Sequence, residues 1–443
     1  MITTVLDAAA AAAAAVDRAA SRTPATCRIG LLGLGNVGSA FARHVRESAP
    51  HLARRGFVPL VSTALVRSTA PSRAAAVYVD AVTDDVDDFF AEPVDVIVEA
   101  LGGVEPAYTL VRRALDRGIP VVTANKSLIA AYGEELAHVA RRRATALRFE
   151  ASCIAGVPFL GMFARRPLAA RASGVTAILN GTSNSILTAM TSGETFDVAL
   201  ANAQRLGFAE PDPSMDISGA DAAEKLTILI RLFGRLLVDP AALPLDGIDN
   251  IEPADIAAAA AFGGAIRPVA QAAWSDRAVQ AFVGPAFVGG AHPLARVGGV
   301  TNGIVIAPIR NGHGVQGAQC FIGPGAGPDV TAATLLDDVA EVVTERRVCP
   351  PSPESSQTAT SVVRPHSAWF VRLEGDARES DIADLLGSYG IWTTRVERRG
   401  GRAYVLTCSA AYTRVQGALD ALQAATRGTA AGFPAILDME EPC

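Results

Sequence analysis

The stretch IGLLGLGNVGSA, residues 29–40, decides the fold of the amino-terminal part of this chain. It begins as a short apolar strand, continues as a helix, and spaces three glycines as G-x-G-x-x-G between them. In this motif the glycines permit a tight turn, let a pyrophosphate approach the backbone, and let the helix pack closely on the strand. The stretch therefore predicts a dinucleotide site at the amino end of a helix. The residues expected to contact the cofactor here are Gly33, Gly35, Asn36, Val37 and Gly38.

Short apolar runs separated by amphipathic stretches continue outward from this motif. They are Ile29–Leu34, Val58–Val66, Val94–Ala100 and Val121–Thr123. Such runs are typical of buried parallel strands, and repeated βα units predict a doubly wound sheet. We expect a Rossmann-type NAD(P)-binding domain over residues 26–150, completed by about residues 310–345.

The choice of cofactor can be inferred from a missing carboxylate. NAD sites commonly place Asp or Glu at the end of the second strand to bind the ribose 2′-hydroxyl, whereas a 2′-phosphate requires arginine. No carboxylate occurs between Glu47 and Asp80, and the second predicted strand leads directly into Arg67. This pattern favours NADP, with NAD as the alternative. It predicts that Arg67, helped by Ser68 and Arg73, binds the 2′-phosphate, unless Arg67 is only a solvated surface residue.

The pattern of the sequence changes beyond residue 150. Predicted strands near Gly174–Leu179 and Val279–Phe287 alternate with long helical stretches, which predicts an α+β domain over residues 151–309. Residues 349–367 are rich in proline, serine and threonine and are typical of a linker. Residues 1–25 form an alanine-rich tail of low complexity.

Residues 368–443 show the order βαββαβ, with two strands on either side of Gly400-Gly401. This order predicts a small ferredoxin-like module that folds separately after the linker. The module contains no group of nucleophiles, bases or metal ligands. Either dimerisation or effector binding would explain its presence.

The composition excludes several classes of protein. With 443 residues, half of them hydrophobic, the chain is long enough for two or three buried cores. Its 39 basic and 45 acidic residues include no dense basic run, so no nucleic-acid partner is expected. No apolar run reaches the roughly 20 residues of a membrane helix, and the amino end lacks the basic region of a secretion signal. We therefore expect no membrane partner and a cytoplasmic location. The six scattered cysteines lack C-x-x-C spacing, which argues against zinc and disulfides.

Only two of the 39 basic residues are lysines, Lys126 and Lys225. A buried lysine can give up its proton, whereas arginine stays charged. A bias towards arginine would explain the scarcity, but it would leave the remaining lysines at random positions. Lys126 follows a predicted parallel strand by three residues, and ligands of such sheets bind at the carboxyl ends of the strands. We expect Lys126 beside both the nicotinamide and the substrate.

Lys225 lies in a predicted helix that starts near Ser218. Asp221 precedes Lys225 by four residues, which places both on one face of the helix. A cap formed by Ser218 and a stabilising Asp221–Lys225 pair would explain these residues structurally. Upstream lies an acidic segment containing Glu210, Asp212 and Asp216. Carboxylates can hold the ammonium of an amino acid, and a lysine can hold its carboxylate or hydroxyl, so we predict an amino acid substrate.

Several motifs resemble those of homoserine dehydrogenases in their order and approximate spacing. They are GLGNVG at 33–38, ANK at 124–126, FEASCIAGVPFL at 149–160, ILNGTSNSILTAM at 178–190, GFAEPDPSMDISGADAAEKLTIL at 207–229 and GPGAG at 323–327. The resemblance covers about residues 27–343, and the tail resembles an ACT domain. It implies reversible NAD(P)-dependent interconversion of L-homoserine and L-aspartate 4-semialdehyde in threonine, methionine and isoleucine biosynthesis. It also implies a monofunctional homodimer or homotetramer, dimerising through residues 151–309, with L-threonine as an effector of the tail.

The resemblance also implies roles for individual residues. Lys225 would transfer the proton with Asp221 beside it, and Lys126 would contact both substrate and cofactor. The remaining substrate contacts would be Glu210, Asp216, Gly181 and Thr182. Gly327 would lie at the cofactor. A sodium ion would be bound, largely through backbone carbonyls, by Glu150, Cys153, Ala155 and Val157; oxygen ligands suit such a hard cation.

Two other functions remain open on the sequence alone. One is a related NADP-dependent dehydrogenase that acts on another amino alcohol or semialdehyde. The other is a protein that binds NADP and an amino acid as a sensor without catalysis. The presence of Lys126, Glu210, Asp221 and Lys225 together argues against the sensor, because binding without catalysis does not require all four.

Overall fold

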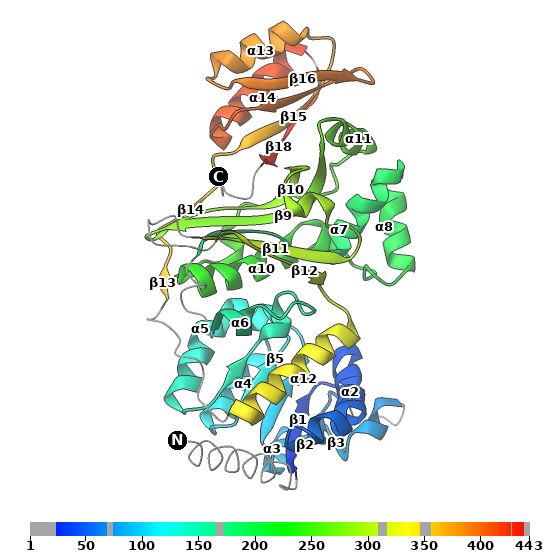
Figure 1. Cartoon of the computed structure of the whole chain (residues 1–443), viewed down its shortest axis with the longest axis vertical. Helices are drawn as coiled ribbons and strands as arrows, with labels where there is room; N and C mark the ends of the chain where they lie inside the picture. The colour runs from blue at the N-terminus through cyan, green and yellow to red at the C-terminus, as the bar shows by residue number, and fades with distance from the viewer. Residues whose placement is uncertain are drawn as a thin grey trace, which may run out of the picture. The chain divides into compact units, whose positions relative to one another are not determined.

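The computed structural model describes residues 24–68, 74–164, 172–308, 317–345, 356–426 and 428–437 (Figure 1). The chain forms two compact units. The first consists of residues 1–125, 136–149 and 328–349, and the second of residues 126–135, 150–327 and 350–443. Nearly all of the predicted amino-terminal tail, Arg73 and residues 349–355 of the predicted linker lie outside the described residues.

The first unit contains a six-stranded parallel sheet with the order β3-β2-β1-β4-β5-β6. Its strands are β1 Ala25–Leu32, β2 Phe57–Leu65, β3 Ala81–Thr83, β4 Val96–Glu99, β5 Val121–Thr123 and β6 Leu147–Arg148. The central strands are buried on both faces, which explains their continuous apolar sequence. The predicted Rossmann-type sheet is confirmed.

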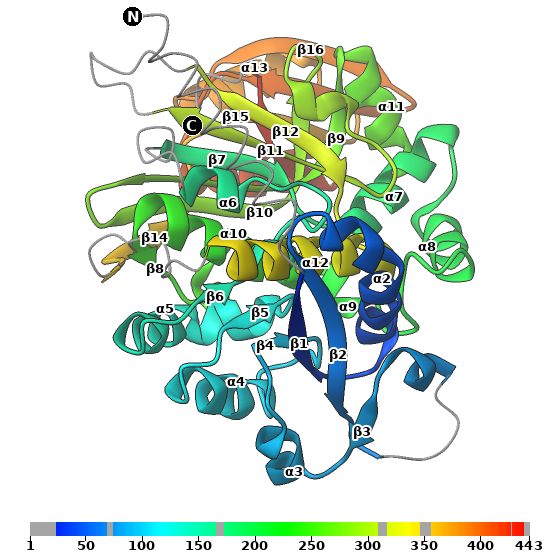
Figure 2. The same cartoon turned by 60° about the horizontal axis from the view of Figure 1, so that its bottom comes forward.

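Helices complete this unit. They are α2 Asn36–Ala53, η1 Ala74–Tyr78, α3 Val86–Ala91, α4 Ala107–Asp116, α12 Pro328–Glu345 and the later part of α5 Lys126–Arg142. Helices α2 and α12 pack side by side although they are far apart in sequence (Figure 2). Asp329 of α12 contacts Arg43 and His44 of α2, with 3.2 Å to the His44 Nε2.

The second unit is organised around a ten-stranded mixed sheet, whose main path is β12-β11-β7-β9-β10-β18-β15-β17-β16. The strands that precede its carboxyl-terminal part are β7 Ala172–Ile178, β9 Gly264–Ser275, β10 Ala278–Gly289, β11 Thr301–Pro308, β12 Gln319–Pro324 and β14 Ser361–Val363, and a separate pair consists of β8 Leu236–Leu237 and β13 Gln357–Thr358. The helices are η2 Glu150–Ser152, α6 Leu160–Ala164, α7 Gly181–Ala189, η3 Met190–Ser192, α8 Phe196–Arg205, α9 Ser214–Ile217, α10 Ala220–Leu229, η4 Ile230–Gly234, η5 Pro240–Ala242, α11 Pro253–Ala261 and η6 Pro293–Arg296. The predicted α+β character of this part is confirmed.

The carboxyl-terminal module has the predicted order βαββαβ. Its elements are β15 Ala368–Glu374, α13 Glu379–Ser388, β16 Thr393–Arg399, β17 Arg402–Thr407, α14 Tyr412–Thr426 and β18 Ala430–Ile436. The strands form the ferredoxin-like order β18-β15-β17-β16, all antiparallel. Buried residues of the strands and of both helices, among them Trp369, Leu386 and Leu422, form the module's own core.

This module belongs to the second compact unit and does not form a unit of its own; its separate folding remains a prediction. Strand β18 pairs with β10 in parallel, with Phe287 opposite Ala435. The ring of Phe370 stacks on those of Phe287 and Tyr404 at 5.1 and 5.7 Å between centroids. The linker composition indicated a boundary, but it contained no information on the aromatic residues that pack across it.

No helix in the described part of the chain is both long and apolar enough to cross a membrane.

Candidate active site

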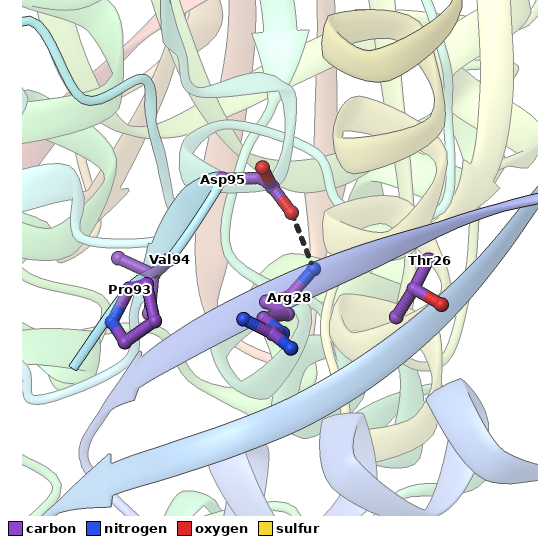
Figure 3. A pocket seen from close by; sticks show the side chains of 5 residues that line it. All are labelled: Thr26, Arg28, Pro93, Val94 and Asp95. Carbon is purple, nitrogen blue, oxygen red and sulfur yellow. Dashed lines mark hydrogen bonds between the residues drawn. The ribbon is translucent and has the colours of Figure 1, made fainter.

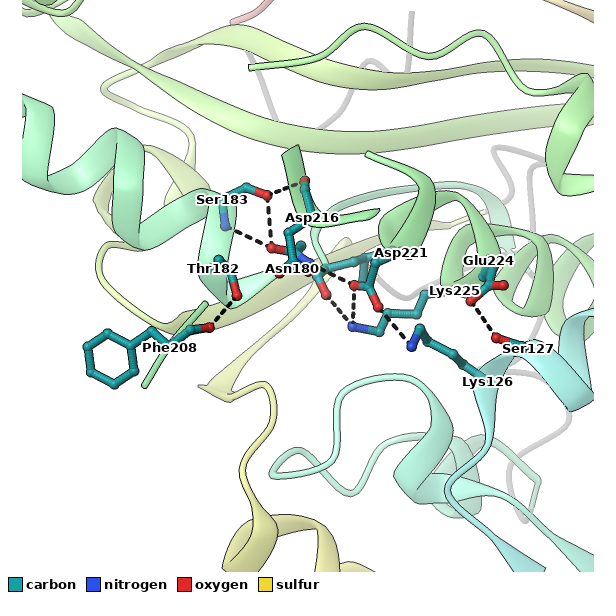
Figure 4. Close-up of polar contacts among 11 residues, drawn as sticks. Lys126, Ser127, Asn180, Thr182, Ser183, Phe208, Asp216, Asp221, Glu224 and Lys225 are labelled. Carbon is teal, nitrogen blue, oxygen red and sulfur yellow. Dashed lines mark hydrogen bonds and ion pairs between the residues drawn. The ribbon is translucent and has the colours of Figure 1, made fainter. Parts of the chain in front are cut away.

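Both lysines of the chain converge on one carboxylate, that of Asp221 (Figure 4). Lys225 Nζ lies 2.8 Å from Asp221 Oδ2, and Lys126 Nζ lies 3.2 Å from Asp221 Oδ1. Asp221 and Lys225 are one turn apart on α10, whereas Lys126 is the first residue of α5. A cation at the amino end of a helix opposes the helix dipole. Contact with Asp221 therefore explains the position of Lys126 better than helix stability does.

The contacts of Asp221 and Lys225 are almost entirely removed from solvent. Asp221 is 7% exposed and Lys225 is 8% exposed. Lys225 Nζ also donates a hydrogen bond of 2.8 Å to the carbonyl of Leu179. Burial opposes ionisation of Asp221, but the two lysines and Asn180 outweigh it and lower the pKa of Asp221 to about 2. Burial would lower the pKa of Lys126, but Asp221, together with the charges of Glu224 and Asp216, outweighs burial and raises this pKa.

Asn180 connects Asp221 to the acidic segment upstream. Its side-chain nitrogen donates to Asp216 at 2.6 Å and to Asp221 at 2.9 Å. Its oxygen accepts from the amide of Ser183 at 2.8 Å, which caps α7. Burial, with a smaller contribution from Asp221, raises the pKa of Asp216 despite the hydrogen bond from Asn180. We call this group the lysine cluster; its members are Lys126, Asn180, Asp216, Asp221 and Lys225.

The sequence did not identify Asn180 as a functional residue. The available signal was its position, because asparagine directly follows a strand and precedes a helix in ILNGTSN. Such a residue is a typical N-cap, and its amide nitrogen then remains available for other contacts.

The other predicted substrate residues differ in their proximity to the lysine cluster. Gly181 starts α7, and a Cβ atom there would lie 2.8 Å from the carbonyl of Val300, so only glycine fits. Thr182 donates to the carbonyl of Phe208 at 2.7 Å. Glu210 is exposed, and among the described residues its carboxylate contacts no member of the cluster.

Ser218 does not cap α10, so the alternative explanation of this segment as a helix cap does not hold. Helix α10 begins at Ala220, and its N-cap is Gly219, which has a φ of +86° and makes no side-chain cap. Ser218 instead ends the short helix α9. The left-handed Gly219 turns the chain sharply between Asp216 and Asp221, which brings both carboxylates to Asn180.

The glycine turn, residues 33–38, lies at the carboxyl end of β1 in the first unit. Gly33 has a φ of +97°, and its amide donates to the carbonyl of Leu65 at 2.9 Å. A Cβ on Gly38 would lie 2.0 Å from the Gly33 carbonyl, whereas a Cβ on Gly35 would meet nothing within 4 Å. Gly38 therefore serves the packing of α2, and Gly35 leaves open space at the helix amino end. This geometry fits the approach of a pyrophosphate.

Known proteins resemble the chain over most of its length. The family profile "Homoserine dehydrogenase" matches residues 158–340, and the profile "Homoserine dehydrogenase, NAD binding domain" matches residues 33–150. A homoserine dehydrogenase of Mycobacterium tuberculosis is 37% identical over 350 residues, which make up 76% of this chain and 77% of the relative. The chain belongs to the homoserine dehydrogenase family.

Solved structures agree with this assignment. A homoserine dehydrogenase from Thiobacillus denitrificans has a TM-score of 0.83 at 29% identity and covers 94% of this chain and 99% of that one. A hyperthermophilic archaeal homoserine dehydrogenase in complex with NADPH has a TM-score of 0.59 at 27% identity, covering 72% and 98%. The chain is thus an NAD(P)-dependent oxidoreductase that interconverts L-homoserine and L-aspartate 4-semialdehyde.

In this homoserine dehydrogenase fold, the sheet of the first unit carries a buried acid that the sequence did not single out. Glu99 ends β4, and its carboxylate accepts from the amide of Leu101 at 2.8 Å and from the hydroxyl of Thr123. It also accepts from Asn125 at 3.3 Å. Burial raises the pKa of Glu99 despite these hydrogen bonds. Glu99 therefore holds the turn at the carboxyl end of β4, the edge of the sheet at which cofactors bind.

The loop expected to bind sodium is built around Glu150. Its carboxylate accepts from the amides of Phe159, Leu160 and Gly161 at 2.6–2.8 Å, at the start of α6. Burial raises the pKa of the Cys153 thiol to about 12, so this side chain is neutral. No group of three or more His, Cys, Asp or Glu side chains in the described residues could hold a metal. A cation here would depend on backbone carbonyls and a shared Glu150 carboxylate.

A separate hollow lies at the amino ends of the strands of the parallel sheet, opposite the glycine turn (Figure 3). Its lining residues are Thr26, Arg28, Pro93, Val94 and Asp95. They lie at the amino ends of β1 and β4, where Asp95 accepts from the Arg28 amide at 2.7 Å. Ligands of open α/β sheets bind at the other edge. This hollow is therefore not the cofactor site of a homoserine dehydrogenase.

Proposed function

We propose that Lys225 is the residue that transfers the proton in homoserine oxidation and in semialdehyde reduction. The observation that carries this proposal is the burial of Lys225 between the Asp221 carboxylate and the Leu179 carbonyl. Both contacts hold Nζ at 2.8 Å and fix its position. A positioned lysine can take or give a proton, whereas an arginine cannot.

Oxidation of the alcohol requires a single base, which accepts the hydroxyl proton while the hydride leaves the carbon. NAD(P), held at the glycine turn, would supply the acceptor for the hydride that leaves the carbon bearing the hydroxyl. The hydroxyl proton moves to the neutral amine of Lys225, and the carbon–oxygen single bond becomes the aldehyde. In the reverse direction the ammonium of Lys225 returns the proton to the aldehyde oxygen. Asp221 keeps the lysine in place, because its pKa of about 2 leaves it ionised throughout.

The acidic residues supply the recognition of an amino acid. Asp216 is half-buried and oriented by Asn180, so it can accept from the substrate ammonium. Glu210 is exposed in the described structure and would contribute only when its carboxylate turns towards the substrate. Lys126 is 34% exposed, and its ammonium can contact the substrate carboxylate or hydroxyl as well as Asp221. Gly181 and Thr182 would line the same pocket.

We propose NADP as the preferred cofactor. Arg67 and Ser68 are exposed two and three residues beyond Leu65, whose carbonyl accepts from the Gly33 amide. Among the described residues, no side chain forms a hydrogen bond or ion pair with the guanidinium of Arg67. The guanidinium is therefore available for a 2′-phosphate. Lys126 and Gly327 remain predicted cofactor contacts. The NADPH complex of the archaeal relative is consistent with this preference.

The remaining roles are also proposals. Sodium would bind through the carbonyls of Cys153, Ala155 and Val157 and a shared Glu150 carboxylate, which oxygen chemistry permits. The carboxyl-terminal module would act as an ACT domain with L-threonine as effector, in a homodimer or homotetramer. Threonine, methionine and isoleucine biosynthesis, in the cytoplasm, is the context expected for this reaction.

The test of the function is NADPH formation with L-homoserine against a panel of other hydroxy amino acids. We expect homoserine to have the highest kcat/KM. Equal or higher values for another hydroxy amino acid would favour a related dehydrogenase, and the absence of turnover with every substrate would favour a sensor.

A further inference from the structure

Arg231 is a buried cation that the proposed reaction does not use. It is 8% exposed and lies in the apolar run that follows the catalytic face of α10, between Ile230 and Phe233, which are also buried. Removing a guanidinium from water is costly unless the protein compensates it. Burial lowers the pKa of Arg231, while the nearby charge of Glu134 acts in the opposite direction. The contacts of Arg231 must therefore offset the cost of burying its guanidinium.

One hydrogen bond of Arg231 leads to the helix that carries Lys126. Its Nη1 donates to the carbonyl of Ile129 in α5 at 2.8 Å. Arg231 belongs to the π-helical turn η4, which continues α10. A π-helical turn closes from residue i to i+5 instead of i+4, and such turns are frequent at functional sites. The helix that bears Asp221 and Lys225 therefore contacts α5 at two places, through Asp221 and, by way of this turn, through Arg231.

Gly133 provides the space for this contact. A Cβ atom at Gly133 would lie 2.1 Å from Arg231 Nη1 and 2.7 Å from its Cζ. The guanidinium therefore lies directly against the backbone of α5. Glycine destabilises a helix interior relative to alanine. The close approach of Arg231 is a physical reason for glycine at this position.

The positions on α5 connect these contacts to the lysine cluster. Lys126, Ile129 and Gly133 are spaced i, i+3 and i+7, so they share one face of the helix. Lys126 contacts Asp221 on the first turn, and the neighbouring Ser127 hydroxyl donates to Glu224 of α10 at 2.9 Å. Arg231 joins the same pair of helices one to two turns further along. Two separated attachments fix both the position and the direction of the first turns of α5.

We propose that Arg231, seated against Gly133, is a positioning residue that holds Lys126 against Asp221 and thereby sets the charge around Lys225. The proposal rests on the roles proposed above for Lys126, Asp221 and Lys225. Without Arg231, the first turns of α5 lose one attachment, and Lys126 moves relative to Asp221. Moving one of two cations away from a shared carboxylate changes both substrate binding and the proton balance of the cluster.

The test is a double-mutant cycle with Arg231→Met and Gly133→Ala. Each single variant should lower kcat/KM for homoserine by about tenfold or more, within the roughly 100-fold that a misplacement of about 1 Å can cost. Each should also shift the pH at which the rate is half-maximal. The double variant should be no worse than Arg231→Met, because the added methyl group then has no guanidinium to displace. Arg231→Lys should recover part of the activity, since it keeps a donor and a charge.

Arg267→Met is the matched control. Arg267 is also buried, also has a pKa lowered by burial, and donates to a backbone carbonyl, that of Ala295, at 2.8 Å. It should lower the melting temperature without shifting the pH profile. An unchanged pH profile with kcat/KM within twofold of wild type in Arg231→Met, or full additivity in the cycle, would overturn the proposal. If Arg231→Met does not fold, Gly133→Ala and Arg231→Lys decide by the same criteria.

Lys225→Arg, measured alongside, distinguishes failure of the positioning role of Arg231 from failure of the proposed proton transfer by Lys225. Loss of activity in Lys225→Arg with a normal Arg231→Met contradicts only the positioning role. Retained activity in Lys225→Arg contradicts the proposed proton transfer, and with it the basis of the positioning role.

Discussion

The glycine turn contains no charged side chain, whereas four of the five members of the lysine cluster are charged residues. The glycine turn depends on the absence of side chains and on backbone amides. The lysine cluster depends on buried charges of opposite sign that stabilise one another. The difference determines what damages each site. An added methyl group threatens the glycine turn, whereas the lysine cluster is sensitive to any change in charge or in proton-transfer chemistry.

Lys225→Arg should have the largest effect, because it keeps the positive charge but removes the ability to exchange a proton. We expect kcat to fall by at least about 100-fold, which is typical of a positioned acid–base group. Steady-state kinetics in both directions measure the loss, and the melting temperature serves as the folding control. Turnover near that of wild type would remove Lys225 from the mechanism.

Gly38→Ala and Gly35→Ala should separate packing from ligand approach within the glycine turn. The Gly38 variant places a Cβ against the Gly33 carbonyl, so we expect a loss of about 1–3 kcal/mol in unfolding free energy. The Gly35 variant has open space for its Cβ and should keep its stability but bind the cofactor more weakly. Denaturant unfolding and cofactor titration measure the two effects. Equal stability losses in both variants would contradict this division of roles.

Asp221→Asn tests the electrostatics of the lysine cluster through pH. The pKa of Asp221 falls from its usual 3.8 to about 2 in the folded chain, so ionised Asp221 stabilises the fold above pH 4. This contribution, about 2 kcal/mol, should be lost as the pH falls from about 4 to about 2. The difference in unfolding free energy between wild type and Asp221→Asn should therefore shrink over this range. A difference that stays constant from pH 5 to pH 2 would show that the cluster does not lower this pKa.

Arg67→Ala should have the smallest effect, because Arg67 is exposed. Losing one charged hydrogen bond to a 2′-phosphate should reduce the preference for NADP over NAD by roughly tenfold. The ratio of kcat/KM values for the two cofactors measures this change, and Arg28→Ala, at the opposite edge of the sheet, is a control. An unchanged ratio would leave Arg67 as a surface residue.

The two sites also differ in how far the sequence could predict them. The glycine turn is formed by residues that are close in the sequence. The spacing of Gly33, Gly35 and Gly38, together with the preceding strand, was therefore sufficient to predict a turn at the end of β1. The lysine cluster joins residues from separate segments, and only the Asp221–Lys225 pair has a helical spacing that can be read directly. Asn180 and Arg231 act through contacts with residues more than 30 positions away. No local pattern reports such contacts.

The carboxyl-terminal module shows the same limit at the level of the fold. Its βαββαβ order could be read from alternating apolar positions. The pairing of β18 with β10 could not be predicted, because the sequence of a strand does not indicate which other strand pairs with its edge. The stacking of Phe370 on Phe287 joins residues 83 positions apart and was equally invisible.

The continuous sheet formed by β10 and β18 has a consequence for engineering this enzyme. Deleting the carboxyl-terminal module would leave an open edge on β10 and uncover Phe262 and Phe287. Bare strand edges and exposed aromatic surface promote aggregation. A shortened enzyme would thus be prone to aggregate. Point substitutions that keep β18 paired with β10 are therefore the better way to alter this module.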